Sequence, residues 1–197
     1  MSDLKNRIVT ESLKLFSLKG FLNTSLTHIL QATNASKGGF YNHFKSKEDL
    51  FYAVMSEARG SWRKRNLAGL AEIEKPVEKI KKLLVNFKDL YLKDTEVFPG
   101  GCIFVTLSVE LADQRPHLAR EINEGFIRLK AMINRLLDQG QASGEVRNEI
   151  DTEDVTEMIF AGMIGASVIF GIEKSFDSLD KSINPLITYL DRIAPYK

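Results

Sequence analysis

Only one of the 197 residues is a cysteine, Cys102. A single cysteine excludes a framework of internal disulfide bonds, which many small extracellular domains need for stability. The first ten residues are polar and mixed, so they lack the apolar core of a secretory signal peptide. The longest uncharged apolar stretch, residues 158–172, is shorter than the about 20 residues of a membrane-spanning helix. These absences predict a cytoplasmic protein that does not enter a membrane.

The signatures of enzymes are missing too. Catalysis needs a nucleophile beside a base, a metal cluster or a cofactor-binding loop. The three histidines, His28, His43 and His117, lie far apart in the sequence. There is no phosphate-binding loop and no Gly-x-Ser-x-Gly motif. The sequence therefore predicts a protein that is not an enzyme and that uses no cofactor and no metal ion.

Strand-like alternation and internal repeats are also absent, and only five prolines interrupt the chain. Apolar residues instead recur every three or four positions along almost the whole sequence, which is the spacing of amphipathic helices. We therefore expect an all-α protein with about nine helices. They are expected over residues 3–18, 26–33, 37–44, 47–71, 76–92, 102–111, 116–140, 155–170 and 179–193.

Charge is distributed unevenly along the chain. Residues 1–47 contain seven lysines and arginines but only two acidic residues, which gives a net charge of +5. The rest of the chain contains 20 basic and 24 acidic residues, a net charge of −4. A basic module on a mildly acidic body attracts phosphates at one end only, so the pattern favours DNA as a partner.

Two short helical patterns, residues 26–33 and 37–44, flank a tight turn within the basic segment. Ser25 and Ser36 precede them and are suited to cap the two helices. Asn34 lies in the turn, where a positive φ is expected and asparagine tolerates it. Two helices joined in this way form a helix-turn-helix motif, whose second helix enters the major groove of DNA.

The second of these helices has an unusual composition for a structural element. Gly38 and Gly39 each cost about 1 kcal/mol relative to alanine inside a helix. Glycine lets a backbone approach a partner closely, which is a reason to accept that cost. Phe40 and Phe44 are four residues apart and can anchor the helix to the core, so we expect Lys37 and its polar neighbours to face outward.

A set of residues with specific spacing runs through the start of the chain: Gly20-Phe21, Ser25, Ile29, Ala32, Ser36-Lys37-Gly38, Phe40-Tyr41, His43-Phe44 and Lys47-Glu48-Asp49-Leu50. This set resembles the N-terminal signature of TetR-type (tetracycline repressor) transcriptional regulators. The chain departs from the family pattern at Asn34-Ala35, usually Gly-Val, and at Gly39, usually Thr or Ser. The resemblance implies a helix-turn-helix DNA-binding domain over residues 1–47 and a helical ligand-binding and dimerisation domain over residues 48–197.

Roles follow for individual residues of the first domain. Lys37 is the predicted reader of a base edge, most readily guanine O6 and N7. Lys47, at the positive end of the next helix, is predicted to contact a phosphate, while Ser46 and Asp49 are expected to cap that helix. The predicted DNA-binding residues are Ser25, Thr27, Ser36, Lys37, Gly38, Gly39, Tyr41, Asn42, His43 and Lys47.

The last two helices carry an apolar seam with small residues, which allow helices to approach closely. In TetR-type regulators these helices pair with those of a second subunit, so the resemblance implies a homodimer. A twofold dimer suits double-stranded DNA with a palindromic operator. The predicted dimer interface comprises Val155, Met158, Ile159, Gly162, Gly165, Ala166, Ile169, Leu186 and Leu190.

The resemblance also implies a repressor that a small-molecule inducer releases from its operator. The inducer would lie in the C-terminal domain and shift the two DNA-binding modules. Aromatic residues and Met at helical spacing also occur in ordinary hydrophobic cores. A purely structural role in the core therefore remains an alternative for each of these residues. The predicted ligand-binding residues are Trp62, Tyr91, Phe98, Cys102, Phe104, Phe126 and Met158.

Two alternatives to this function remain from the sequence. Cys102 begins a helix, whose positive end favours a reactive thiolate. The segment from Gly101-Cys102 to Glu110-Leu111 resembles a branch of the family that includes sensors of reactive electrophiles and of small unsaturated acids or aldehydes. Cys102 is therefore either a thiol switch or a buried small side chain. The other alternative is a helical interaction protein without DNA binding, against which the basic module and Tyr41-Asn42-His43 argue.

Overall fold

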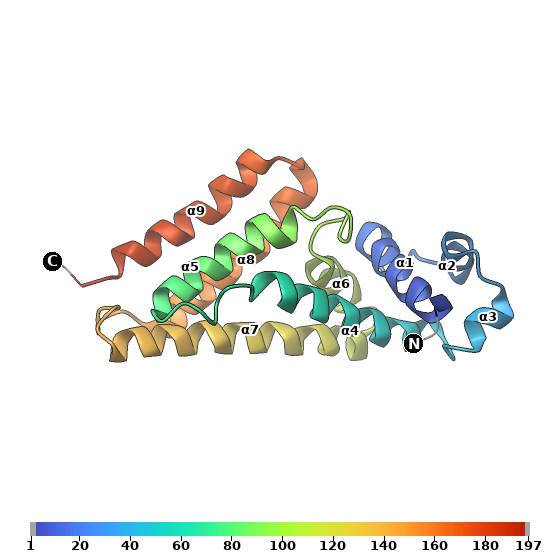
Figure 1. Cartoon of the computed structure of the whole chain (residues 1–197), viewed down its shortest axis with the longest axis horizontal. Coiled ribbons are helices and arrows are strands. Elements are labelled where there is room, and N and C mark those ends of the chain that lie inside the picture. The colour runs from blue at the N-terminus through green and yellow to red at the C-terminus, as the bar shows by residue number, and fades with distance from the viewer. Residues whose placement is uncertain (1–2, 196–197) are drawn as a thin grey trace. The chain divides into compact units, whose positions relative to one another are not determined.

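The computed structural model describes residues 3–195, and every regular element in that range is a helix. Nine α-helices and one π-helical segment follow one another, which confirms the expected all-α fold (Figure 1). Their bounds are α1 Asp3–Lys19, α2 Leu26–Thr33, α3 Lys37–Tyr41, α4 Lys47–Asn66, α5 Pro76–Asn86, η1 Phe87–Leu92, α6 Ile103–Leu111, α7 Pro116–Ala142, α8 Thr152–Glu173 and α9 Phe176–Arg192.

The chain divides into two compact units. The N-terminal unit consists of the residues up to Trp62 together with Asp94–Ile122, and the C-terminal unit of Arg63–Lys93 together with the residues from Asn123 onward. This division differs from the single boundary after residue 47 that we expected. The first part of α4 and all of α6 belong to the same unit as the helix-turn-helix segment, although α6 is distant in sequence.

Aromatic side chains hold the core of the N-terminal unit together. The Phe21 ring meets the rings of Phe16 and Phe51 edge to face, with centroids 5.4 Å apart in each pair. Phe40 and Phe44 are buried, as their spacing predicted, and so attach α3 to this core. Edge-to-face pairs add roughly 0.5–1.5 kcal/mol each beyond the area they bury, so this cluster fixes how the short helices pack.

Helices α5, α8 and α9 pack together in the C-terminal unit, with α8 and α9 side by side (Figure 1). Gly162 of α8 lies against the Leu186 side chain of α9, where a Cβ would lie 2.7 Å from a methyl carbon of Leu186. Two ion pairs join α9 to the preceding helices, Lys81 to Asp191 and Lys88 to Asp180. Ser175 caps α9, which begins at Phe176, three residues before the expected start, and Pro185 lies inside the helix.

Helix α8 is, by length and composition alone, the one helix within residues 3–195 that is long and apolar enough to cross a bilayer. A core helix of a soluble protein meets the same criteria. In α8 one face is buried within the C-terminal unit: Val155, Thr156, Ile159, Met163, Ala166, Ser167 and Phe170.

Candidate DNA-binding site

The turn between α2 and α3 has the predicted local chemistry. The Ser25 hydroxyl accepts a hydrogen bond from the backbone N–H of His28 at 3.1 Å, and His28 Nδ1 accepts one from the Ser25 N–H at 3.2 Å. This reciprocal cap uses a histidine where glutamate or glutamine is usual. Asn34 adopts the left-handed conformation, with φ 49° and ψ 40°, and ends α2 as expected.

Helix α3 is short and has two different sides. The Ser36 hydroxyl accepts the N–H of Gly39 at 3.0 Å and caps the helix. Phe40 faces the core, whereas Lys37, Gly38 and Tyr41 are exposed. α3 ends at Tyr41 rather than at Phe44, because the chain turns at Asn42 and His43 before α4 begins.

The two glycines of α3 have different surroundings. A Cβ added to Gly39 would lie 3.3 Å from atoms of Leu4 and Ser36, so this glycine packs against α1. A Cβ added to Gly38 would meet nothing within 4 Å. Packing inside the chain therefore does not explain Gly38. Its exposed backbone leaves space for a partner surface.

Most of the predicted DNA-binding residues lie on the surface of the module. Gly39, His43 and Lys47 are partly buried, and the others are exposed: Ser25, Thr27, Ser36, Lys37, Gly38, Tyr41 and Asn42. These residues come from the start of α2 and from α3 with its flanking turns. The exposed set supplies one ammonium group, four hydroxyl groups and one side-chain amide, which are groups that contact phosphates and base edges.

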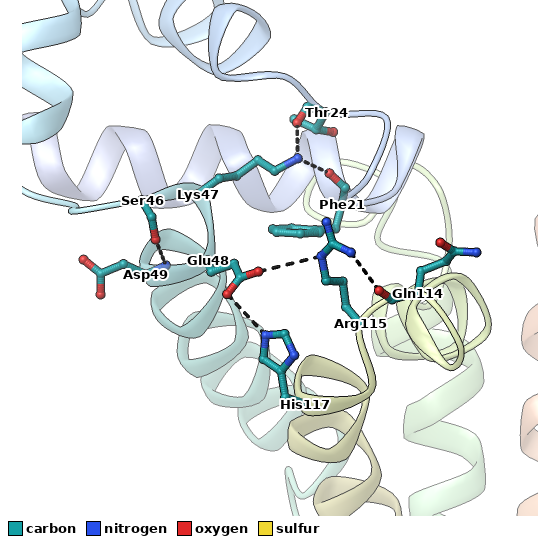
Figure 2. A network of polar contacts seen from close by, with 9 residues as sticks. All are labelled: Phe21, Thr24, Ser46, Lys47, Glu48, Asp49, Gln114, Arg115 and His117. Carbon is teal, nitrogen blue, oxygen red and sulfur yellow. Dashed lines mark hydrogen bonds and ion pairs between the residues drawn. The ribbon is translucent and has the colours of Figure 1, made fainter.

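Lys47 does not extend into solvent as a phosphate-binding side chain would. Its ammonium group donates hydrogen bonds to the carbonyl oxygens of Phe21 and Thr24, each at 2.8 Å (Figure 2). Desolvation by burial lowers its pKa below the usual lysine value, although the nearby Glu110 carboxylate acts in the opposite direction. The structure therefore places Lys47 as an internal connection between α4 and the turn after α1. Sequence reasoning missed this role because the partners are 26 and 23 residues away.

The start of α4 is capped much as predicted. The Ser46 hydroxyl accepts the N–H of Asp49 at 3.0 Å (Figure 2). The Asp49 carboxylate accepts the N–H of Lys45 at 2.9 Å. The return bond thus reaches the residue before the cap, whereas in a capping box it reaches the cap itself.

An acidic side chain at the same end of α4 contacts the start of α7. Glu48 Oε2 lies 3.2 Å from His117 Nε2, and Glu48 Oε1 lies 3.8 Å from Nε of Arg115 (Figure 2). Both partners are separated from Glu48 by more than 60 residues, so no local pattern in the sequence indicated the contact. All three side chains are about half exposed, and such pairs contribute little to stability.

The residues predicted to bind a ligand are divided between the two units. Trp62, Phe98, Cys102 and Phe104 belong to the N-terminal unit. Tyr91, Phe126 and Met158 belong to the C-terminal unit. Tyr91, Phe98 and Cys102 are buried, and Met158 is exposed. An open hollow of about 640 Å³ lies elsewhere, along α9, and none of the seven residues lines it.

The predicted dimer residues occupy two faces of α8 and α9. Four of them are buried inside the C-terminal unit: Val155, Ile159, Ala166 and Leu190. Gly162 and Leu186 contact each other, so they also serve packing within the chain. Met158 and Ile169 are exposed, and a Cβ added to Gly165 would meet nothing within 4 Å. Only these three of the nine lie on a face that is open to a second subunit.

Within the described part of the chain, no group of three or more His, Cys, Asp or Glu side chains is arranged to hold a metal ion. The structure instead contains a capped helix-turn-helix with an exposed second helix, followed by a larger helical region. These features define a DNA-binding protein of the helix-turn-helix class.

Comparison with known families agrees with this class. A model described as bacterial regulatory proteins of the tetR family matches residues 8–54. A second model, the tetracyclin repressor-like C-terminal domain, matches residues 76–185. The chain therefore belongs to the tetR family, and it is a DNA-binding transcriptional regulator.

Individual relatives cover nearly the whole chain. The transcriptional repressor DhaR of Mycobacterium sp. (strain GP1) is 23% identical over 179 residues, which are 90% of this chain and 87% of DhaR. The repressor NemR of Escherichia coli (strain K12) is 22% identical over 190 residues, or 92% of this chain and 90% of NemR. A TetR regulator from Chloroflexus aurantiacus J-10-FL has a similar crystal structure, with 30% identity, a TM-score of 0.88 and coverage of 95% and 94% of the two chains.

Proposed function

We propose that this regulator is a cytoplasmic repressor, which binds a palindromic operator as a homodimer and is released by a small-molecule inducer. The observation that most supports this proposal is the exposed face of α3. Gly38 has open space around it, and Lys37 and Tyr41 flank it on the surface. α3 therefore offers a close backbone approach together with one cation, which suits the major groove.

The similarity to two named repressors supports repression rather than activation. The net charge of +5 on residues 1–47 favours association with DNA and makes the affinity depend on salt. Lys37 reads a base edge in this proposal, whereas the hydroxyls of Ser25 and Thr27 contact phosphates at the start of α2.

The homodimer is supported by an apolar face of α8 that the described residues, 3–195, leave exposed. Large side chains on this face and at the start of α9 are between 37% and 78% exposed, and Gly165 lies among them with open space at its Cβ. An uncovered apolar surface of this kind marks a site of association. The exposed side chains are Met158, Val168, Ile169, Ile172 and Phe176.

The inducer is proposed to bind within the C-terminal unit, which contains Tyr91, Phe126 and Met158 of the predicted ligand-binding residues. Tyr91 is buried there, whereas Met158 belongs to the exposed face of α8. Release requires that the inducer bind more tightly to the conformation that does not bind DNA, and coupling of about 1–3 kcal/mol is typical for such effects. Because Met158 is exposed on this face of α8, it is better suited to the subunit interface than to ligand contact.

DNA binding at fixed salt tests the proposal. Full-length protein is titrated into labelled duplexes from the DNA upstream of its own gene and into a shuffled duplex. We expect tighter binding to a duplex with an inverted repeat, with affinity that falls as salt increases. Lys37→Ala should reduce discrimination between the two duplexes, whereas Lys64→Ala, an equal loss of charge at an exposed site of α4, should retain it. Equal affinity of the wild type for all duplexes would contradict the proposed operator.

A further inference from the structure

The turn that connects α1 to α2 is held by side chains from two other helices. Gly20 begins this turn with φ 78°, a conformation that favours glycine. The Thr24 hydroxyl donates a hydrogen bond to the Gly20 carbonyl at 2.6 Å and closes the turn internally. The next residue, Ser25, caps α2, so the path of this turn sets where the helix-turn-helix begins.

Glu110 of α6 holds one side of the turn. Its Oε2 accepts the N–H of Phe21 at 2.7 Å, and its Oε1 accepts the N–H of Leu22 at 3.0 Å. A Cβ at Gly20 would lie 2.3 Å from Oε1 of this carboxylate, so the contact requires glycine there. Hydrogen bonds to a charged acceptor are roughly twice as strong as neutral ones.

Lys47 of α4 holds the other side of the same turn. It donates to the carbonyl oxygens of Phe21 and Thr24, while Glu110 accepts from N–H groups. Within residues 21–24, the carboxylate thus binds backbone N–H groups and the ammonium group binds backbone carbonyl oxygens. Burial lowers the pKa of Lys47, and the nearby Glu110 carboxylate offsets part of that effect.

The segment that carries Glu110 is attached to α1 at a second point. The Ser17 hydroxyl accepts the N–H of Gly100 at 3.1 Å and donates to the Gly101 carbonyl at 3.4 Å. A Cβ at Gly100 would lie 1.7 Å from the Ser17 carbonyl oxygen, so the two backbones are in direct contact. Residues 100–110 are therefore fastened to the end of α1 both before and at the end of α6.

From this geometry we infer that Glu110 is a positioning residue for DNA binding, which acts through the turn of residues 20–24 and touches no DNA itself. The inference rests on the proposed operator binding. Glu110 lies outside residues 8–54, which the DNA-binding family model covers, so the DNA-binding module is completed by a residue of α6. Without the carboxylate, the N–H groups of Phe21 and Leu22 lose their acceptor and the start of α2 is no longer fixed.

The substitution Glu110→Gln tests this role. Glutamine has nearly the same shape, but it offers one acceptor oxygen and turns a donor toward the other N–H group. We expect the operator affinity of the folded variant to fall about tenfold, which is the effect of about 1.4 kcal/mol. Net charge alone predicts the opposite, because removal of a negative charge should tighten binding to DNA. The sign of the change therefore separates positioning from general electrostatics.

Four further measurements complete the test. Glu124→Gln removes an equal charge from an exposed site of α7 and should not weaken operator binding. Glu110→Asp keeps the charge and should recover part of the affinity. In amide NMR spectra, the signals of Phe21 and Leu22 should shift in Glu110→Gln and remain in place in Glu124→Gln. The dependence of affinity on salt should keep its slope, since no phosphate contact is lost.

Unchanged or tighter operator binding by folded Glu110→Gln would overturn the inference. If the glutamine variant is too unstable to test, the comparison of Glu110→Asp with the wild type decides it, and equal affinities count against positioning. A wild type that fails to prefer any inverted repeat would refute the proposed operator instead. The two failures are distinguished by the wild-type titration alone.

Discussion

The Nζ atom of Lys47 lies 2.8 Å from the carbonyl oxygen of Phe21 and 4.3 Å from the centre of the Phe21 ring. One side chain of α4 thus contacts both the backbone and the ring of a residue that follows α1. The position of Lys47 near the start of a helix suggested a phosphate contact, but the ammonium group is directed into the module. Its main contribution is therefore to the stability and shape of the module.

Lys47→Met should lower the free energy of unfolding by about 1–2 kcal/mol, because two carbonyl oxygens lose a charged donor while the apolar stem remains. Lys45→Met is the matched control, since Lys45 is exposed and carries the same charge. Urea denaturation followed by circular dichroism measures both variants. Equal stability of the two would show that the ammonium group does not hold the turn.

The parts of the fold that sequence predicted well depend on neighbouring residues. The caps at Ser25 and Ser36 and the left-handed conformation of Asn34 each follow from a side chain and the backbone a few residues away. Such interactions require no knowledge of tertiary structure. They were sufficient to locate the helix-turn-helix and the exposed side of α3.

Contacts between distant segments were not predictable in the same way. Helical spacing shows that an apolar seam on α8 is covered, but not whether α9 or a second subunit covers it. The contact of Gly162 with Leu186 shows that one part of the seam is covered within the chain. The sequence did not distinguish Glu110 from an ordinary acidic surface residue, because its partners Phe21 and Leu22 are almost 90 residues away.

The ion pair between Lys81 and Asp191 provides a test of how α9 is held against α5. Burial lowers the pKa of Lys81, but hydrogen bonds to Asp191 and Glu78 outweigh burial and leave the pKa raised. The folded state therefore binds this proton more tightly than the unfolded chain. The stabilisation is complete below the usual lysine pKa and is lost only as pH rises through the higher folded value.

Lys81→Met should accordingly lower the free energy of unfolding by about 1 kcal/mol. The difference from the wild type should stay constant from neutral pH to about pH 9, well below the unperturbed value of lysine. Chemical denaturation at several pH values measures this difference. A difference that vanishes between neutral pH and that limit would contradict the assigned pairing.

Cys102 is 6% exposed and stands at the start of α6. A buried thiol reacts slowly with reagents in solution, because access limits the reaction. We expect iodoacetamide to modify Cys102 slowly in the native protein and rapidly in urea, as measured by intact-protein mass spectrometry. Rapid modification of the folded protein, together with loss of operator binding, would instead support a thiol switch.

The exposed face of α8 predicts where dimerisation can be disrupted. Gly165→Leu adds a side chain at a position with open space inside the chain, so the subunit should fold normally but no longer allow close approach of a partner. Gly125→Leu is the control, since a Cβ on that α7 glycine also meets nothing within 4 Å. Light scattering should find the wild type and the control at twice the chain mass of 22.2 kDa, and Gly165→Leu at the single mass. A dimeric Gly165→Leu protein would move the interface away from this face.

The strongest test of whether α3 approaches DNA closely uses a substitution that should increase the stability of the folded protein. Gly38→Ala places a methyl group in open space, so within the chain it removes only the helix penalty of glycine, up to about 1 kcal/mol. Gly60→Ala has the same surroundings on α4 and should stabilise the protein by a similar mechanism.

The two variants should differ when DNA is present. We expect operator affinity to fall at least about tenfold in Gly38→Ala, because the added methyl group prevents the closest backbone approach, and to stay unchanged in Gly60→Ala. Titration of labelled operator and thermal unfolding of the same samples provide the two readouts. A variant that is more stable and yet binds less cannot have lost affinity through misfolding. If Gly38→Ala binds as tightly as Gly60→Ala, the backbone of α3 does not approach the DNA at this position.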